Sequence, residues 1–489
     1  MFITSQMLLS YQRCPRQVFL DSFGDRALRG RPSDFRIKLS KDRVKYQNTV
    51  LGDQPDWVKP DYPRHDWDTG ADATLKLMEQ GVSHIHGGVL RFKTDDNITL
   101  ISTPDLLTRE SGVSVFGDWY YTASDIKLSK RPKQDYQVIA AYHAYLLSEM
   151  QGVESTEAWL YLRDKGWYLV DLEVTLAKLL NLLPDLIEIA TETYEPDVFI
   201  VRNRCQLCAW FDHCYDLAQS SKHLSLLPGV TPSRYPILEE NDLLTVEAIA
   251  NQHPHTLNQN TGFGLSVCQQ LVHQARATTS QQPILLAKSS PFETLARLPD
   301  SPIELYFDIE AEPSINVVYL HGVLLVNRLT GYQKFYPFLA ETPDQEQQAW
   351  DSFVDFVMSY PDAPIYHFCP YEVQTMKRFA RKYGTPFTVI EQLVPRCVDV
   401  HHWVTQAVTL PIENYTLKVI ARWLGFKWRN SEASGAQSIC WYEDWLNQND
   451  RDLLNIILEY NEDDCVATYQ IKDWLAGYLT EQQVTPQCS

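Results

Sequence analysis

The C-terminal part of the chain has the clearest pattern of apolar and polar positions. From about residue 301 the segment IELYFDIEAE alternates as a β-strand does, and further strands are predicted at VVYLHGVLLV, KFYPFL, APIYHF and CVDV. Helical periodicity predicts helices at 344–359, 371–383, 415–424 and 451–475. Strands first, followed by strand–helix alternation, predict an α/β domain over residues 301–489.

The earlier part of the chain divides into two regions. Residues 1–220 mix helical and strand patterns and end in the cysteine-rich segment NRCQLCAWFDHC. Residues 221–300 contain helical periods, a Pro228-Gly229 turn and the polar stretch ATTSQQP, which together predict a helical linker. A helix-hairpin-helix module, which holds a nucleic-acid backbone through main-chain amides, is the alternative for this region. Because 489 residues are too many for one hydrophobic core, we expect a multi-domain α/β protein.

Apolar runs are too short for a membrane span. The longest candidate, 169–190, is interrupted by Asp171, Glu173, Lys178 and Pro184, whereas a span needs roughly 18 apolar residues in succession. The segment MFITSQMLLSYQRCPRQ has no basic leader and no small-residue cleavage site. We therefore expect a cytoplasmic protein without a membrane partner, in which disulfides are improbable.

Charge does not decide the question of nucleic-acid binding. The net charge is −19, of which residues 300–489 contribute −13 and residues 1–299 contribute −6, although phosphates attract lysine and arginine. Basic clusters remain within 26–45, 127–133 and 377–382. Since magnesium sites themselves require clustered carboxylates, an acidic chain is compatible with a nuclease.

Four of the ten cysteines form a pattern with metal-ligand spacing. Cys205-x2-Cys208-x5-Cys214 places three thiols within one loop and turn, and Cys14 lies near the other end of the same region. Four thiolates suit either zinc or a [4Fe–4S] cluster, and the spacing alone does not separate the two. Either would join the two ends of this domain, so its loss would unfold the domain.

The cysteine pattern resembles that of the RecB-like nucleases of the PD-(D/E)xK superfamily that carry an iron–sulfur cluster. The resemblance favours [4Fe–4S] over zinc and implies a restriction-endonuclease-like α/β domain over residues 1–220. It also implies a metal-binding acid followed by an acid-x-Lys pair, which Asp105, Asp125 and Lys127 supply. On a strand Asp125 and Lys127 share a face. Two carboxylates would then hold Mg²⁺ or Mn²⁺, and the lysine would orient and activate the attacking water.

Two features depart from that family. The family has a catalytic Gln followed four residues later by Tyr; Gln137 matches, but the residue four positions on is Ala141, with Tyr142 one later. The family also places a His or Glu metal ligand on an early helix, whereas RVKYQNTVL offers Gln47 as the nearest polar residue. These departures leave the activity of the first site open.

A second set of carboxylates lies in the C-terminal region. Asp308 and Glu310 are two residues apart on a predicted strand, and Tyr460 and Asp464 are four apart on a predicted helix, so each pair shares a face. Glu372 lies in the first turn of a helix after a strand, where it could also be only a favourable helix-dipole contact. Such acids can hold two divalent ions about 4 Å apart for phosphodiester hydrolysis, with the tyrosine orienting the water.

These residues resemble the motifs of the DnaQ-like 3′–5′ exonucleases, which have the ribonuclease-H fold, in the branch with Tyr-x3-Asp in the last motif. The resemblance covers about 301–475 and implies catalytic and metal-binding roles for Asp308, Glu310, Glu372, Tyr460 and Asp464. The middle acid of the family is usually Asp, so Glu372 requires a different geometry. The neighbour Asp463 could compete with Asp464, but helical spacing from Tyr460 favours Asp464.

Together the motifs predict a metal-dependent nuclease with two potential sites. The fused arrangement resembles a group of bacterial RecB-like nucleases, which implies single-stranded nucleic acid as substrate, DNA before RNA, and a role in DNA repair or defence. The chain has no G-x4-G-K-[ST] segment, so a separate helicase would supply any unwinding. The alternatives are a nucleic-acid-binding or scaffold protein with one or both sites inactive, and a zinc-containing structural adaptor.

Overall fold

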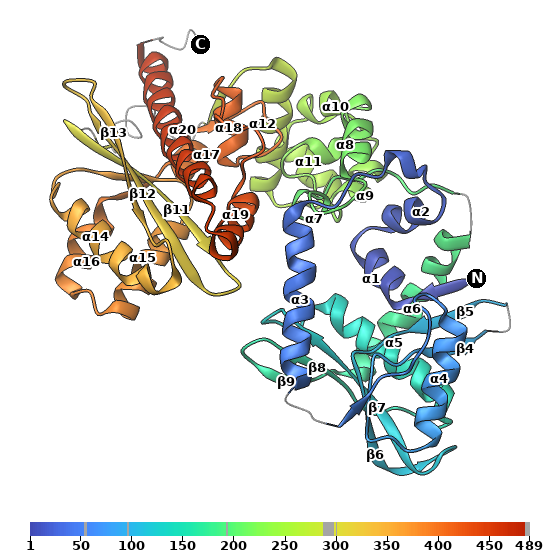
Figure 1. The fold of residues 1–489 in the computed structure, drawn as a ribbon. Helices are drawn as coiled ribbons and strands as arrows, with labels where there is room; N and C mark the ends of the chain where they lie inside the picture. Colours follow the sequence, from blue (N-terminus) through green and yellow to red (C-terminus); the bar gives the residue numbers. More distant parts are fainter. Residues whose placement is uncertain (53–55, 95–96, 192–193, 287–297, 300, 485–489) are drawn as a thin grey trace. The chain divides into compact units, whose positions relative to one another are not determined.

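The computed structural model describes residues 1–52, 56–94, 97–191, 194–286, 298–299 and 301–484 (Figure 1). The chain divides into two compact units. The first comprises Met1–Val198 and Arg202–Leu217, and the second comprises Phe199–Val201 and Ala218–Ser489. Both contain helices and sheets, which confirms the predicted multi-domain α/β architecture in its coarse form.

The first unit contains two sheets. The larger sheet has the strand order β2-β3-β6-β7-β8-β9, and the smaller has the order β1-β5-β4. The strands are β1 (Phe2–Thr4), β2 (Trp57–Val58), β3 (His84–His86), β4 (Leu90–Lys93), β5 (Thr99–Ser102), β6 (Leu106–Ser114), β7 (Gly117–Lys127), β8 (Ala158–Leu162) and β9 (Gly166–Leu169). The helices are α1 (Ser5–Arg13), α2 (Pro15–Phe23), α3 (Asp34–Gly52), α4 (Trp67–Glu79), α5 (Gln134–Gln151), α6 (Leu172–Thr191), α7 (Arg202–Cys205) and α8 (Phe211–Ser220), whose last residues belong to the second unit.

The helix α5 is the centre of the first unit. It is apolar on most sides, because Val138, Tyr142 and Leu146 join one core cluster while Ala140 and Ala144 join another. Such a helix must be covered all round, and it packs against β7, β8 and α6. The strand β7 is buried over its last residues, so its C-terminal end reaches the interior beside α5.

The second unit is built around a five-stranded mixed sheet with the order β13-β12-β11-β14-β15. The strands β13, β12 and β11 are antiparallel neighbours, and β11, β14 and β15 are parallel. Their bounds are β11 (Ile303–Glu312), β12 (Val317–Asn327), β13 (Gln333–Leu339), β14 (Ile365–His367) and β15 (Cys397–Asp399). All five were expected from the alternation of the sequence, although β14 and β15 are shorter than the apolar runs that predicted them.

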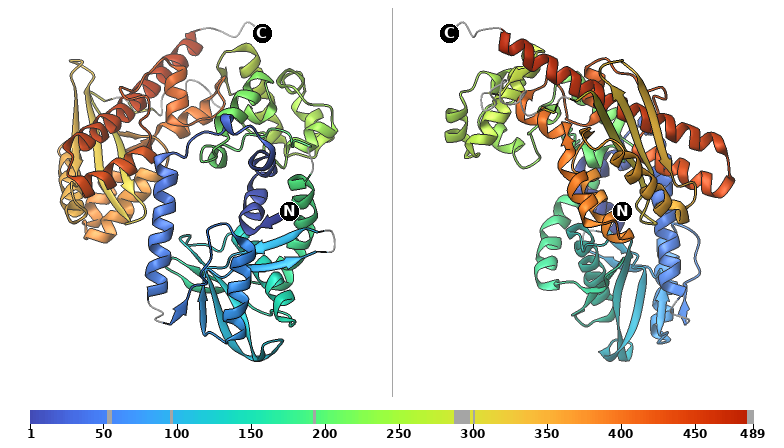
Figure 2. Two further views of the ribbon diagram at one scale, coloured as in Figure 1. Left: turned by 45° about the vertical axis from the view of Figure 1, so that its right-hand side comes forward. Right: turned by 90° about the vertical axis from the view of Figure 1, so that its left-hand side faces the viewer.

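Helices cover both faces of this sheet (Figure 2). The long helix α20 (Arg451–Val484) packs against β11 and β12, and its buried residues share a core with Tyr306 and Leu324. On the other face, α14 (Glu346–Met358) and α15 (Tyr371–Tyr383) form a core with Leu305 and Phe307. Because side chains alternate along a strand, the even-numbered positions of β11 face α20 and the odd-numbered positions face α14 and α15.

The remaining helices of the second unit include elements that the apolar pattern did not predict. Those expected are α14, α15, α18 (Leu417–Trp423) and α20; those not expected are α16 (Phe387–Leu393), α17 (Val400–Ala407) and α19 (Gly435–Gln448). α16 and α17 are no more than two turns long, too short for a clear helical period. A further two-stranded ribbon joins β10 (Ile284–Leu285) to β16 (Val408–Thr409).

The segment expected to be a linker is folded and has its own core. Its helices are α9 (Tyr235–Glu240), α10 (Val246–Ala250), α11 (Pro254–Thr261) and α12 (Leu265–Ser280). Leu238, Ile249, Leu257 and Leu271 are fully buried together. Gln274 of α12 donates hydrogen bonds to Leu410 O at 2.7 Å and Ile412 O at 3.2 Å, so these helices are attached to the rest of the second unit.

A search for membrane spans over the described residues found no helix that combines the length and the apolar character needed to cross a bilayer.

A buried ion pair fastens α20 to the sheet. Lys472 Nζ lies 2.6 Å from Glu304 Oε1 on β11, and Tyr306 donates to the other carboxylate oxygen at 2.7 Å. The Glu304 side chain is inaccessible to solvent. Arg328 Nε lies farther away, 3.7 Å from Glu304 Oε2, so Lys472 is the closer cation. Because a buried carboxylate that loses its partner is destabilising, the pair contributes to the docking of α20.

We expect Lys472→Met to lower the free energy of unfolding of the second unit by about 3 kcal/mol, because it removes the hydrogen-bonded cation of the buried Glu304 carboxylate. Arg451→Met is the matched control, since it breaks the exposed Arg451–Glu341 pair and should cost at most about 1 kcal/mol. Urea denaturation followed by tryptophan fluorescence measures both. Equal effects of the two variants would contradict the assignment.

Candidate metal centre

Three carboxylates converge between β11 and α20. Asp308, Glu310 and Asp464 each offer an oxygen, and these oxygens all lie within 4.8 Å of one another. Among the described residues, these three acids form the group of at least three His, Cys, Asp or Glu side chains whose ligand atoms all lie within 4.8 Å of one another. Clustered carboxylate oxygens are the ligands that Mg²⁺, Mn²⁺ and Ca²⁺ prefer.

Local structure explains why the three acids meet. Asp308 and Glu310 are two residues apart on β11 and face α20, which carries Asp464 on the side that packs on the sheet. Gly322 of β12 lies opposite Asp308 in the register. A Cβ at Gly322 would collide with the Asn461 side chain, so only glycine lets α20 approach this closely.

Neutral side chains hold the carboxylates in place. Asn461 Nδ2 donates to Asp308 Oδ2 at 2.7 Å, and Trp428 Nε1 donates to Asp464 Oδ1 at 2.7 Å. Ser438 and Asn461 hydrogen-bond to Glu310, and Tyr460 hydrogen-bonds to Asp464. These donors orient the acids without neutralising them, which leaves the negative charge of the group available to a cation.

Burial and mutual charge disfavour the ionised form of the clustered acids. Burial raises the pKa of Asp308 well above its usual range, and the negative charges of Asp464, Glu310 and Glu372 raise it further. The pKa of Glu310 is likewise raised by burial and by Asp464. Burial also raises the pKa of Asp464 to about 6, against the hydrogen bonds from Trp428 and Tyr460. Without a cation, these acids would therefore hold protons.

The structure separates the two adjacent acids of α20. Asp463 accepts hydrogen bonds from the Arg429 backbone N and Nε, each at 2.8 Å. Asp464 instead faces Asp308 and Glu310, one helical turn from Tyr460. Asp464 is thus the member of the pair placed with the other acids, as its spacing from Tyr460 indicated.

Glu372 lies beside the group of three without belonging to it. It begins α15, is buried, and its Oε2 lies 3.5 Å from His367 Nδ1. Burial raises its pKa, and its charge acts on Asp308, so the two carboxylates are electrostatic neighbours. Asp399 accepts hydrogen bonds from the backbone N of Cys369 and His402, both at 3.1 Å, which is a structural role at a turn and a helix start.

Several residues of the site were not predicted from the sequence. Lys418 Nζ lies 5.0 Å from the Tyr460 ring centre and 5.4 Å from that of Trp428, and its charge acts on Asp464 and Glu310. Asn461 could have been found, because it precedes Asp464 by three helical positions. Trp428 and Lys418 are distant in sequence from the acids, so no spacing pointed to them.

The first unit brings Asp105, Asp125 and Lys127 together at the end of β7. Lys127 Nζ lies 2.7 Å from Asp125 Oδ2, and Asp105 Oδ2 accepts from Ile126 N at 2.7 Å. Burial disfavours the charge on Asp125, but Lys127 and His143 outweigh it and hold its pKa well below its usual range. Burial and Asp125 raise the pKa of Asp105. Unlike Asp308, Glu310 and Asp464, Asp125 is hydrogen-bonded to a lysine.

Two further side chains reach this group. His143 on α5 places Nε2 3.2 Å from Asp125 Oδ2, and its Nδ1 contacts Ser102 Oγ. Gln47 on α3 donates through Nε2 to Asp105 Oδ1 at 2.8 Å. Gln47 thus occupies the position on an early helix for which the sequence offered no acidic or histidine ligand, and His143 was not predicted at all.

Gln137 is placed differently from the other predicted residues of this site. Its Nε2 donates to Pro132 O at 2.8 Å, within the turn that begins α5. The Tyr142 hydroxyl donates to Ile3 O at 2.9 Å in the core. Neither of these hydrogen bonds is directed to Asp105 or Asp125.

The four cysteines of the predicted cluster are half-buried thiols in one region of the first unit. Burial raises the pKa of Cys14 to about 11, and the other three thiols add to the shift, so all four are electrostatic neighbours. Cys208 and Cys214 pack on Trp210, whose Nε1 donates to Asp21 Oδ1 at 2.9 Å. The structure therefore brings together cysteines about 190 residues apart in the chain.

Titration of the acidic group makes the stability of the metal-free protein depend on pH. Because the folded-state pKa of Asp464 is raised from 3.8 to about 6, the metal-free protein loses stability as pH rises through about 6. We expect Mg²⁺ to raise Tm more at pH 8 than at pH 5.5, because protons no longer compete with the ion. Thermal melts with Mg²⁺ or EDTA measure this. An Mg²⁺ effect that does not depend on pH, or that persists in Asp308→Asn, would count against the site.

Part of the second unit is similar to a known protein family. Residues 305–476 match the family model RNase_H_2, described as RNase_H superfamily. No curated protein matches the chain. The matched range contains β11, α15 and α20, and with them Asp308, Glu310, Glu372 and Asp464. Residues 305–476 are therefore similar to ribonuclease-H-like domains, a class whose members are typically nucleases that use Mg²⁺ or Mn²⁺ and act on nucleic acid.

Proposed function

We propose that this protein is a metal-dependent nuclease that hydrolyses phosphodiester bonds of single-stranded nucleic acid, DNA in preference to RNA. One observation carries the proposal: Asp308, Glu310 and Asp464 are buried within 4.8 Å of one another, with raised pKa values. Buried acids that are clustered and have raised pKa values are more typical of a functional site than of a purely structural one. The ribonuclease-H-like match over 305–476 supports the same chemistry.

The donor set fits a hard divalent cation. Asp308, Glu310 and Asp464 would hold Mg²⁺ or Mn²⁺. Glu372, whose charge acts on Asp308, would be a further ligand. The bound ion would stabilise the negative charge that develops on the phosphate and lower the pKa of the attacking water. Asn461 and Trp428 keep the carboxylates oriented toward this position.

Tyr460 is suited to positioning water. It is hydrogen-bonded to Asp464, and burial together with the nearby acids raises its pKa well above its usual range. It therefore stays protonated at neutral pH and can donate a hydrogen bond to, or accept one from, a water at the acids. The resemblance of this set to the exonucleases with Tyr-x3-Asp supports removal of nucleotides from a 3′ end.

The first unit is proposed as a second hydrolytic site. Asp105 and Asp125 would hold the metal, and Lys127 would orient the water. Binding a cation here requires Asp125 to exchange part of its contact with Lys127 for the ion, since the two now lie 2.7 Å apart. The alternative, supported by this pairing and by Gln47 in place of an acidic ligand, is a unit that binds nucleic acid without cleaving it.

A [4Fe–4S] cluster is proposed at Cys14, Cys205, Cys208 and Cys214. Four neighbouring thiols, from the two ends of the first unit, form a donor set that fits it. A tetrahedral zinc site would place its sulfurs about 3.8 Å apart, since each Zn–S bond is about 2.3 Å. The resemblance of the Cys14 and Cys205-x2-Cys208-x5-Cys214 pattern to the iron–sulfur RecB-like nucleases favours the cluster over zinc.

The nuclease proposal predicts different outcomes for two adjacent acids. We expect Asp308→Asn and Asp464→Asn to abolish the stepwise shortening of 5′-labelled single-stranded DNA in Mg²⁺ or Mn²⁺, because either removes a metal ligand. Asp463→Asn should retain it, since Asp463 pairs with Arg429 instead. Denaturing gels of anaerobically purified full-length protein, with circular dichroism to confirm folding, measure this.

Variants of the first unit separate the two sites. Asp125→Asn should leave 3′ shortening intact and remove only cleavage that persists in Asp308→Asn. If the wild type cleaves neither DNA nor RNA faster than the Asp125→Asn/Asp308→Asn double variant, the protein is not a nuclease, and the binding or scaffold function is correct.

The cluster proposal predicts a brown protein that contains iron and acid-labile sulfide in equal amounts. Cys208→Ser should lose the visible absorbance and lower the Tm of the first unit, because the cluster joins its two ends. Cys268→Ser is the control, since Cys268 is buried in the helical core of the second unit. Stoichiometric zinc without iron in anaerobically purified protein would overturn the cluster assignment.

A further inference from the structure

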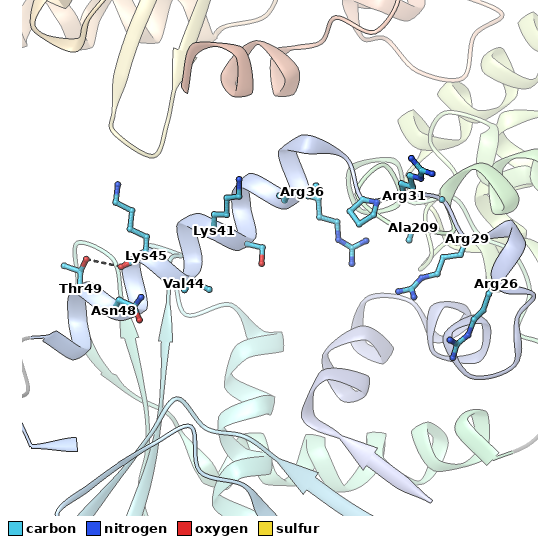
Figure 3. Close-up of a pocket in the computed structure, with 14 residues that line it drawn as sticks. Arg26, Arg29, Arg31, Arg36, Lys41, Val44, Lys45, Asn48, Thr49 and Ala209 are labelled. Carbon is cyan, nitrogen blue, oxygen red and sulfur yellow. Dashed lines mark hydrogen bonds between the residues drawn. The ribbon is translucent and has the colours of Figure 1, made fainter. Parts of the chain in front are cut away.

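A groove of about 1300 Å³ runs along α3 and the loop before it, within the first unit (Figure 3). Cationic side chains from both segments line it, and none of its lining residues is Asp or Glu. The cations are Arg26, Arg29, Arg31, Arg36, Lys41 and Lys45. This concentration stands out in a chain whose net charge is −19.

The charges on α3 are not explained by the stability of the helix. Lys41 and Lys45 are exposed and four residues apart, so they repel each other along one face. The acid between them, Asp42, instead pairs with the buried Lys38 at 2.9 Å. The groove side of α3 therefore keeps its positive charge, which indicates a polyanionic ligand.

The groove also contains exposed apolar surface. Ile37 and Val44 line it with 43% and 51% of their surface exposed, next to Pro32. Phosphates alone would not need such contacts, and a duplex would hide its base faces from them. A single strand presents both a row of phosphates and unpaired bases with apolar faces. Its chemistry therefore fits the alternation of cations and aliphatic side chains along the groove.

Hydrogen bonds join one end of α3 to the cysteine segment and the other end to Asp105. Gly30 N donates to Ala209 O at 2.7 Å, and Arg36 donates to Leu207 O at 3.1 Å, so the cysteine segment supports one end. At the other end Gln47 donates to Asp105 at 2.8 Å, and Arg43 lies 3.9 Å from the same carboxylate. A ligand that follows α3 is thereby led toward Asp105.

We propose that this groove binds a single strand of DNA and guides it along α3 to the Asp105–Asp125–Lys127 group. The inference rests on the proposed function in that the strand is the substrate of that group. The 19 residues of α3 span about 28 Å at roughly 1.5 Å per residue, long enough for several nucleotides. Binding through phosphates and aliphatic surface would be largely independent of base sequence.

The test uses the full-length protein and a fluorescent oligothymidylate in EDTA, so that binding is measured without cleavage. Arg31→Glu, Lys41→Glu and Lys45→Glu are combined in one variant. Lys76→Glu, Lys165→Glu and Lys178→Glu form the control, because these lysines are equally exposed on the first unit, lie outside the groove and give the same change in net charge. Anisotropy titrations over a range of salt concentrations measure affinity.

We expect the groove variant to weaken binding on the order of 10- to 100-fold and to reduce the salt slope by about 2, since each lost phosphate contact contributes about 0.7. The control variant should bind as the wild type does. Equal losses in both variants, unchanged binding by the groove variant, or binding of oligouridylate or duplex DNA in place of the single DNA strand would each overturn the proposal.

Cleavage assays keep the two proposals apart. Asp125→Asn and Asp308→Asn should bind the oligothymidylate with wild-type affinity in EDTA, because neither residue lines the groove. If the protein binds DNA through the groove but never cleaves it, the nuclease proposal is wrong and the groove proposal is supported. Cleavage with binding that does not depend on the groove would refute the groove alone.

Discussion

The buried repulsion among Asp308, Glu310 and Asp464 is the constraint on which the second unit depends. Burial raises the pKa values of all three, and the charge of Asp464 raises those of Asp308 and Glu310 further, so the fold must keep them together against an electrostatic penalty. It does so through dense packing of α20 on the sheet and through neutral donors such as Trp428. A divalent cation bound by the three carboxylates would turn the same repulsion into binding energy.

In the first unit, neighbouring side chains compensate the charge of a buried acid. Asp125 is paired with Lys127 and contacted by His143, so its charge is compensated by the protein itself. Asp105 is held by a backbone amide and by Gln47. Any metal that binds at this group must therefore compete with these existing partners. The difference predicts that the second unit is the stronger metal binder of the two.

Helix α3 connects the cysteine segment of the first unit to its acidic group. It is supported by the carbonyls of the cysteine segment at one end and by Asp105 at the other. Loss of the proposed cluster would thus disturb the groove as well as the fold, even though the cysteines themselves perform no hydrolysis. The cysteines, the cationic groove and the acids form one connected arrangement within the first unit.

Sequence alone determined the features that rest on local periodicity. The alternation in IELYFDIEAE predicted β11 and the shared face of Asp308 and Glu310, and helical spacing from Tyr460 distinguished Asp464 from Asp463. Only the tertiary structure decided which distant residues complete the sites, because Trp428, Lys418 and His143 reach the acids through packing that no spacing encodes. The same holds for the folded helices of 221–280, whose core forms only when several short amphipathic segments bury their apolar faces together.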